Sequence, residues 1–325
     1  DEAAVDAVAR RVVELAQARD GEGFIAVSPE ARKRFWLDRA RTAAISRHTN
    51  AFKINEDVVI PLDRLADYSR GIERINIEQS IRNKDAIMAA VLELLAGRTG
   101  GHVDDTAAYD DSAEEGAILD AKRDAAREVV QGARQRWQAI LEHLESSAAE
   151  HLDLLREKER ARVRPGDTLL AMMLRRDLRQ SYTGEVGARL CEIFAGQDHA
   201  GVRERLAATH ARLRDARIFV ALHMHAGDGN VHTNIPVHSA DYGMLQEADR
   251  VVDRIMVLAT SLGGVISGEH GIGLTKLRYL DREKLEAFVA YKGRVDPEQR
   301  FNPGKLMPGS GLERAYTPSL RLVQQ

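Results

Sequence analysis

The sequence predicts an α+β protein in which a small antiparallel sheet is interrupted by a long helical insertion. Two apolar, β-branched segments at 218–225 and 231–235 flank an Asp-Gly dipeptide, the strongest short signal for a β-hairpin. A further segment, 51–61, ends at a proline and is predicted to form another strand. The stretch 62–164 contains no proline and is rich in Ala, Leu, Glu and Arg, which favours helices.

Two helices are expected before the first strand. Residues 2–19 carry alanine, valine and charged residues at helical spacing, which predicts an amphipathic helix. Ser28-Pro29-Glu30 then offers an N-cap, a proline suited to the first turn and an acid that complements the helix dipole. We therefore expect a second helix from this point to about Ser46.

The proline-free stretch predicts a helical hairpin. Helical patterns cover 72–96 and 117–162, and the polar, glycine-rich segment 97–112 between them is the expected hinge. The second pattern is longer than an ordinary globular helix, which is typical of a coiled-coil arm. Shorter helical patterns follow at 169–179 and 199–215.

The chain is expected to return to the sheet after this insertion. Ser239 is a suitable cap for a helix that ends at Leu262, and 265–267 has the composition of a short strand. A last helix is expected over 282–292, with Gly293 as its stop. These elements divide the chain into the start of one domain, a helical insertion and the remainder of that domain, at 1–69, 70–215 and 216–325.

Composition narrows the class of protein. The 47 basic and 50 acidic residues nearly balance, so nothing predicts nucleic-acid binding. The single cysteine, Cys191, excludes an intramolecular disulfide and any cysteine-built cluster. No apolar run is long enough to span a bilayer, and the first residues do not resemble a signal peptide. We expect a cytoplasmic protein, with a peripheral position at the inner membrane as the alternative, and a piece of a longer polypeptide because the chain starts without methionine.

The predicted hairpin gathers histidines on one face. If the Asp-Gly dipeptide forms a two-residue loop, His225 lies opposite His232, and His223 lies opposite Asn234, all on the same side of the sheet. Opposed Cβ atoms lie about 4.5 to 5.5 Å apart, which lets two imidazoles reach one metal ion. Glu269, in a glycine-rich segment, is the expected third ligand. Clustered imidazoles repel one another once protonated, which favours a metal or catalytic site, although the pattern alone leaves structural histidines open.

Three motifs carry a family resemblance. The sequences His-Ala-Gly-Asp-Gly-Asn-Val-His at 225–232, Ser-Gly-Glu-His-Gly-Ile-Gly at 267–273 and Phe-Asn-Pro-Gly-Lys at 301–305 occur in this order. Together they resemble the C-terminal cap domain of the FAD-linked oxidases, the flavin-dependent D-lactate, D-2-hydroxyglutarate and glycolate dehydrogenases. The resemblance covers 28–70 and 216–308, leaves the helical insertion unmatched, and implies a ferredoxin-like antiparallel sheet with C-terminal helices.

The resemblance implies a role for the residues of the first two motifs. In such enzymes two histidines and a glutamate hold a divalent metal, here His225, His232 and Glu269, with zinc, manganese and iron as the expected ions. The adjacent His270 is the implied base for the substrate hydroxyl.

Further residues are similar to the family's binding groups. Arg39 and Lys53 resemble the basic residues that bind the substrate carboxylate, and Asn234 resembles a polar substrate contact. Asn302 is the residue expected at the edge of the flavin.

The implied reaction is oxidation of a small D-2-hydroxy acid that resembles D-lactate or D-2-hydroxyglutarate. The hydride passes from substrate C2 to FAD, which the family holds in a domain that precedes the cap in the same polypeptide. We therefore expect this chain to bind metal but to be inactive alone. Some relatives continue into a ferredoxin-like electron-transfer domain, so such a domain or a separate acceptor is a further expected partner.

Two other functions use single features of the chain. A metal-dependent hydrolase would use the two histidines and Glu269 to activate water. An interaction module would use the helical arm at 117–162 to bind a partner or a second copy, with the histidines serving only the structure. The family resemblance is preferred because three spaced motifs agree.

Overall fold

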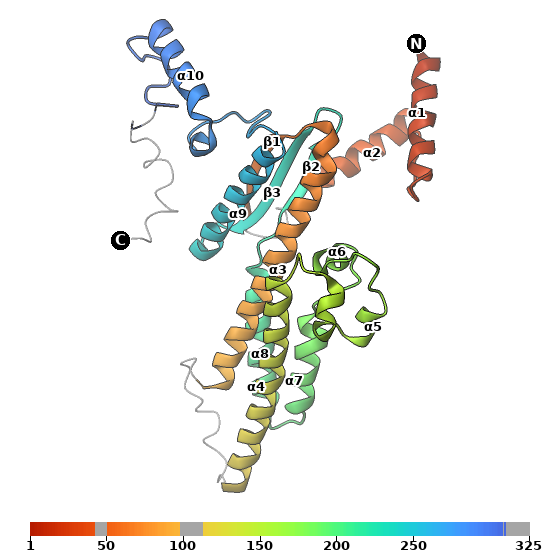
Figure 1. Ribbon diagram of the computed structural model, residues 1–325, viewed down its shortest axis with the longest axis vertical. Coiled ribbons are helices and arrows are strands. Elements are labelled where there is room, and N and C mark those ends of the chain that lie inside the picture. The colour runs from red at the N-terminus through yellow and green to blue at the C-terminus, as the bar shows by residue number, and fades with distance from the viewer. Residues whose placement is uncertain (43–50, 98–112, 308, 310–325) are drawn as a thin grey trace. The chain divides into compact units, whose positions relative to one another are not determined.

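Figure 1 shows the computed structural model of the chain, which describes residues 1–42, 51–97, 113–307 and 309. The chain separates into two compact units, residues 1–50 and 51–325. In the first unit, α1 spans Glu2–Gln17 and α2 spans Pro29–Thr42, as the sequence predicts. The Oγ of Ser28 accepts the N–H of Ala31 at 3.1 Å, so the predicted N-cap of α2 is confirmed. The predicted end of this helix lies outside the described residues.

The second unit contains the predicted antiparallel sheet. Its strands are β1 (Ala51–Val59), β2 (Ala221–His225) and β3 (Asn230–His238), in the order β1-β3-β2. Both pairs of neighbours are antiparallel, although β1 and β2 lie far apart in the sequence. The α+β class is confirmed. The ferredoxin-like arrangement stays a prediction, because the described residues hold these three strands.

One face of the sheet packs on two helices. Val58 of the sheet is fully buried together with Ile72 of α3 (Leu65–Leu95) and Ile255 of α9 (Tyr242–Ser261), in one continuous hydrophobic core. Burial of this apolar surface is the main contribution to the stability of the sheet. Because side chains alternate along a strand, the positions between these core residues point to the opposite face, which carries the histidines.

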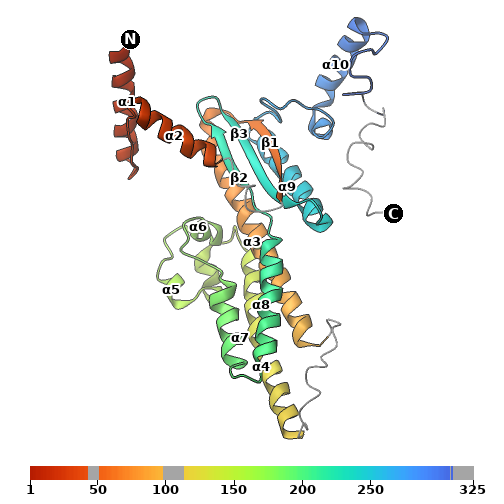
Figure 2. The same cartoon turned by 180° about the vertical axis from the view of Figure 1, so that it is seen from behind.

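A second core lies among the helices that separate β1 from β2. The C-terminal half of α3 contacts α4 (Ala113–Glu142) and α8 (Ala200–Asp215), and α4 contacts α7 (Ala188–Ile193), as Figure 2 shows from behind. Trp137 and Phe194 are fully buried in this core. Since α3 contributes to both cores, it connects the sheet to the helical segment.

The long helical arm expected over 117–162 is interrupted, and this prediction is wrong. Helix α4 ends at Glu142. The chain then folds back, and the N–H groups of Leu169 and Leu170 donate to the carbonyls of Ser146 and Leu144 at 3.2 and 2.7 Å. These bonds and a third buried cluster around Leu144 and Leu169 outweigh the helical propensity of the segment. Short helices follow instead, η4, α5 and α6, at Ala148–Leu154, Glu157–Arg160 and Leu169–Leu174.

Other boundaries differ in smaller ways. Helix α9 is capped by Asp241, whose Oδ1 accepts the N–H of Met244 at 2.9 Å, and not by Ser239. Helix α10 spans Arg282–Val295 and continues through Gly293. Short turns of helix complete the unit, namely η2, η5 and η6, at Leu62–Arg64, Thr183–Gly187 and Leu277–Tyr279. The predicted hinge at 98–112 lies outside the described residues.

Among the described residues, no helix is both long and apolar enough to cross a membrane.

Candidate metal and active site

The turn between β2 and β3 is longer than predicted. His223 pairs with His232, and His225 pairs with Asn230, so the connection contains the four residues 226–229. The expected two-residue loop is therefore wrong, and each histidine of β2 meets a partner two positions earlier than predicted. Because strand side chains alternate with a period of two, this shift keeps every histidine on the predicted face.

The backbone of Gly229 explains the longer turn. A type I′ turn requires positive φ at both central residues, but within the described turn 226–229 positive φ occurs at Gly229, where it is 72°, and not at Asp228. The carbonyl of Gly229 accepts the N–H of Ile60 at 2.9 Å, and the N–H of Asp228 donates to the carbonyl of His225 at 3.0 Å. The turn is therefore hydrogen-bonded to the residue that follows β1.

Replacing Gly229 with alanine is expected to destabilise the sheet. A Cβ atom at this position would collide with the backbone carbonyl of Ile60, and the left-handed conformation alone costs a non-glycine residue roughly 1–3 kcal/mol. Gly227 is a matched control in the same turn, since its φ is not positive and no atom lies within 4 Å of an added Cβ. Urea unfolding should show a clear loss of unfolding free energy for Gly229→Ala and little change for Gly227→Ala. Equal losses would contradict this account of the turn.

Four histidines gather on the exposed face of the sheet. The ring centroid of His232 lies 6.0 Å from that of His223, 5.8 Å from that of His225 and 5.2 Å from that of His270. The first three belong to the hairpin, and His270 belongs to the segment after α9. The predicted gathering of histidines is therefore confirmed in the structure.

Glu269 reaches the histidines because residues 264–276 follow the free edge of β1. Val59 and Val265 exchange both backbone hydrogen bonds, at 3.0 and 2.9 Å. Gly264 permits this close approach, since an added Cβ would lie 2.6 Å from the carbonyl oxygen of Val59. Downstream, Glu269 Oε1 accepts a hydrogen bond from the Nδ2 of Asn230.

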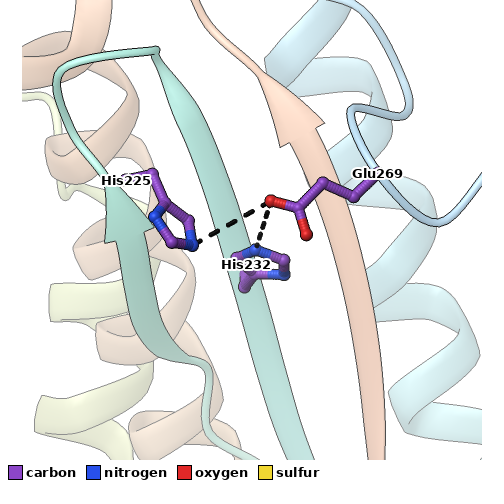
Figure 3. A group of neighbouring side chains, drawn as sticks. All are labelled: His225, His232 and Glu269. Carbon is purple, nitrogen blue, oxygen red and sulfur yellow. Dashed lines mark ion pairs between the residues drawn. The ribbon is translucent and has the colours of Figure 1, made fainter.

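The side chains of His225, His232 and Glu269 converge, as Figure 3 shows. Glu269 Oε1 lies 3.9 Å from His225 Nε2 and 3.7 Å from His232 Nε2, and one ligand atom of each residue lies within 4.8 Å of the others. Two imidazoles and a carboxylate at such spacing suit one divalent ion. Burial lowers the pKa of His232, against an opposing effect of the Glu269 charge. The neutral imidazole that binds metals is thereby favoured.

Asp57 is a buried acid that the sequence analysis missed. It pairs with His232 across β1 and β3 and is 0% exposed. Its Oδ2 accepts the backbone N–H groups of Gly268, Glu269 and His270, with N···O distances of 2.7 Å for Gly268 and 3.1 Å for His270. The carboxylate therefore holds the segment that carries Glu269 and His270.

Lys276 completes this buried group. Its Nζ lies 2.6 Å from Asp57 Oδ1, 2.9 Å from the Asp57 carbonyl and 3.2 Å from Glu56 Oε2. Burial alone would raise the pKa of Asp57, but the bonds from Lys276 and from the three backbone N–H groups hold it well below its usual range. The available signal was an acid placed inside a predicted strand, directly before the apolar residues Val58, Val59 and Ile60.

The structure brings His270 and Asn234 to the same face. His270 Nδ1 lies 3.5 Å from Asp57 Oδ1. Asn234 is 8% exposed and pairs with Asn55. Among the described residues, neither the Oδ1 of Asn234 nor that of Asn55 has a hydrogen-bond partner. Buried oxygens without a hydrogen-bond donor are unfavourable, so a donor bound at this face would stabilise both amides.

The remaining predicted residues lie away from the cluster or outside the description. Lys53 is exposed, pairs with Pro236 and lies one alternate position beyond Asn55 on the same strand face. Asn302 lies in the turn after α10 with a φ of 45°, and no described contact joins it to the histidines. The side chain of Arg39 lies outside the described residues.

The sequence matches one protein family over most of its length. The model of the family described as FAD linked oxidases, C-terminal domain, matches residues 1–109 and 78–306. This match includes 70–215, which the three motifs alone left unmatched.

Relatives match over shorter segments. The chain is 39% identical over 88 residues to the mitochondrial D-lactate dehydrogenase [cytochrome] of Arabidopsis thaliana, which covers 26% of this chain and 16% of the relative. It is 37% identical over 100 residues to glycolate oxidase subunit GlcD of Escherichia coli strain K12, covering 30% and 19%. It is 43% identical over 86 residues to D-lactate dehydrogenase of Archaeoglobus fulgidus, covering 26% and 19%. Each match thus spans less than a fifth of the relative's length, and the chain belongs to the FAD linked oxidases through their C-terminal domain.

Proposed function

We propose that this chain is the substrate- and metal-binding part of an FAD-dependent D-2-hydroxy acid dehydrogenase. The observation that carries the proposal is the convergence of His225, His232 and Glu269 beside His270 on one face of the sheet. Relatives named for D-lactate and glycolate support the substrate class. The three domain segments 1–69, 70–215 and 216–325 remain part of this proposal.

The three converging side chains would hold a divalent ion. Two neutral imidazoles and one carboxylate accept zinc, manganese or iron. When bound, such an ion lowers the pKa of a coordinated hydroxyl and fixes the orientation of the ligand that carries it. Asn230 donates to Glu269 Oε1 and so orients the carboxylate of that residue toward the imidazoles.

His270 is proposed as the base that takes the proton of the 2-hydroxyl. Its Nδ1 lies 3.5 Å from Oδ1 of the buried Asp57 carboxylate, which helps to orient the imidazole ring. FAD, held in another domain of the same polypeptide, supplies the acceptor for the hydride from C2. The chain alone is therefore expected to be inactive.

The substrate-binding groups are proposed from the family likeness, and for Asn234 and Lys53 also from their positions in the sheet. Asn234 is buried next to His232 along β3, and Lys53 lies farther along the same face on β1. An amide and an ammonium group there can bind the carboxylate of a D-lactate-like or D-2-hydroxyglutarate-like acid. Arg39 is proposed as a second carboxylate ligand, and Asn302 as a contact at the flavin edge. A ferredoxin-like domain or a separate acceptor would take the electrons.

A cytoplasmic location, or a peripheral position at the inner membrane, remains part of the proposal.

Flavin reduction in the full-length enzyme tests the proposed reaction. With D-lactate or D-2-hydroxyglutarate under anaerobic conditions, His270→Asn is expected to reduce the flavin about 10²- to 10⁴-fold more slowly than the wild type, the range typical of a lost general base. His238→Asn is the matched control, since His238 is the last residue of β3 and has no assigned role. Undiminished reduction by His270→Asn would contradict the assignment. Metal-dependent ester hydrolysis without flavin would favour a hydrolase instead.

A further inference from the structure

The segment 267–270 is attached to the sheet mainly through one carboxylate. Oδ2 of Asp57 accepts the N–H groups of three successive residues, and its Oδ1 accepts the Oγ–H of Ser267 at 3.1 Å and a bond from Lys276 Nζ. Among the described backbone hydrogen bonds, these three N–H groups have no other acceptor. The segment belongs to no helix or strand, so regular structure does not fix its path.

Burying both charges of this pair is unfavourable unless each is compensated. Asp57 is 0% exposed and Lys276 is 2% exposed, and an isolated ion that is removed from water in this way is strongly destabilising. Apart from the ammonium group of Lys276, every hydrogen-bond donor to the Asp57 carboxylate belongs to segment 267–270. Lys276 also binds the Asp57 carbonyl at the free edge of β1. The pair therefore serves one part of the fold, namely the backbone that precedes and follows Glu269.

Asp57 does not itself complete the ligand set. Both of its oxygens are already occupied by hydrogen bonds, and its side chain has no exposure. Its position in the sheet is nevertheless directly opposite His232. Because Asp57 holds segment 267–270 and also pairs with His232, it fixes the position of this segment relative to one of the two histidines.

We propose that Asp57 and Lys276 are positioning residues that set the backbone of 267–270 so that the carboxylate of Glu269 faces His225 and His232. Glu269 is then held at both ends, by Asp57 at its backbone N–H and by Asn230 at its carboxylate. This inference rests on the proposed metal site. Neither residue of the pair belongs to the converging group of His225, His232 and Glu269.

The chain contains a similar pair that provides a matched control. Asp296 is 8% exposed, accepts Lys292 Nζ at 2.9 Å and accepts the N–H groups of Arg300 and Phe301 at 2.8 and 3.1 Å. Like Asp57, it joins a buried lysine to consecutive backbone N–H groups of an irregular segment. No described contact joins Asp296 to the histidines or to Glu269.

Zinc and cobalt titrations of the 325-residue chain test the proposal. Asp57→Asn is expected to weaken zinc binding about 10- to 100-fold, the range found when groups that orient metal ligands are removed. Its cobalt complex should also show altered visible absorption bands, because the glutamate ligand is displaced. Asp296→Asn should lower the melting temperature in the same way but leave zinc affinity and the cobalt spectrum unchanged. A purely structural role for Asp57 would affect the melting temperature alone.

The outcomes separate this inference from the proposed function. If the wild type binds zinc and Asp57→Asn binds it equally well with the same cobalt spectrum, the positioning role is overturned and the metal site stands. If the wild type binds neither ion, the metal site is wrong and the inference falls with it. Should Asp57→Asn fail to fold, Lys276→Gln is the second variant, because it removes the charged partner that holds the Asp57 carboxylate in place. It must weaken zinc binding, or the proposal for the pair is overturned.

Discussion

Replacing His232 with alanine is expected to weaken zinc binding by about two to three orders of magnitude. Zinc sites built from four protein ligands contribute roughly 10–16 kcal/mol, so one ligand accounts for about 3 kcal/mol. His232 is the more buried of the two histidines in the proposed ligand set, and its Nε2 lies 3.7 Å from Glu269 Oε1. Its loss leaves one imidazole and one exposed carboxylate, which do not form a specific site. Isothermal titration with zinc measures the change.

His223→Ala is the matched control for this experiment. His223 pairs with His232 across the hairpin and its ring centroid lies 6.0 Å away, yet its nitrogens are not part of the converging group. Zinc affinity should therefore stay close to that of the wild type. A loss in His223→Ala as large as in His232→Ala would contradict the assigned ligand set and would point to a site built from the hairpin histidines.

Replacing Trp137 with alanine is expected to lower the free energy of unfolding by about 3–5 kcal/mol, the range for truncating a fully buried tryptophan. Trp137 is 0% exposed at the centre of the second core. Its indole N–H donates to Glu185 Oε2 at 2.9 Å, and Arg136 binds the same oxygen at 3.0 Å. The variant thus loses apolar volume and a buried hydrogen bond, while Glu185 keeps a charged partner.

Trp137→Phe separates the two contributions. It keeps most of the ring and removes the hydrogen bond, so its loss should be about 1–2 kcal/mol. Urea unfolding at neutral pH measures both values, and zinc affinity of the folded protein should not change, because Trp137 belongs to a different core from the sheet. A loss in Trp137→Ala below that of Trp137→Phe would contradict the described packing.

The face of the sheet that carries the histidines could be predicted from the sequence, although the register could not. A shift of two residues preserves the side of every residue on a strand, so His225 and His232 share a face with the predicted two-residue loop and with the observed four-residue loop alike. The turn itself depends on the contact between Gly229 and Ile60, which are far apart in the chain. Local turn preferences therefore do not predict which turn forms.

The role of Asp57 and the end of α4 also depend on contacts between distant residues, which local sequence patterns do not predict. The bonds from Asp57 to the segment 267–270 join residues more than 200 positions apart, and no local pattern predicts them. Helix α4 ends where the chain meets residues 167–170, while its own sequence favours continuation of the helix. Glu269 was predicted because a glycine-rich motif marks the place, but what holds it there is a tertiary contact.

The metal content of the purified chain tests the central claim most directly. The wild type and a His225→Ala, His232→Ala double variant are analysed by mass spectrometry after zinc supplementation and removal of free ions. We expect near-stoichiometric metal in the wild type and none in the variant. Equal metal in both proteins, or none in either, would contradict the proposed site of His225, His232 and Glu269.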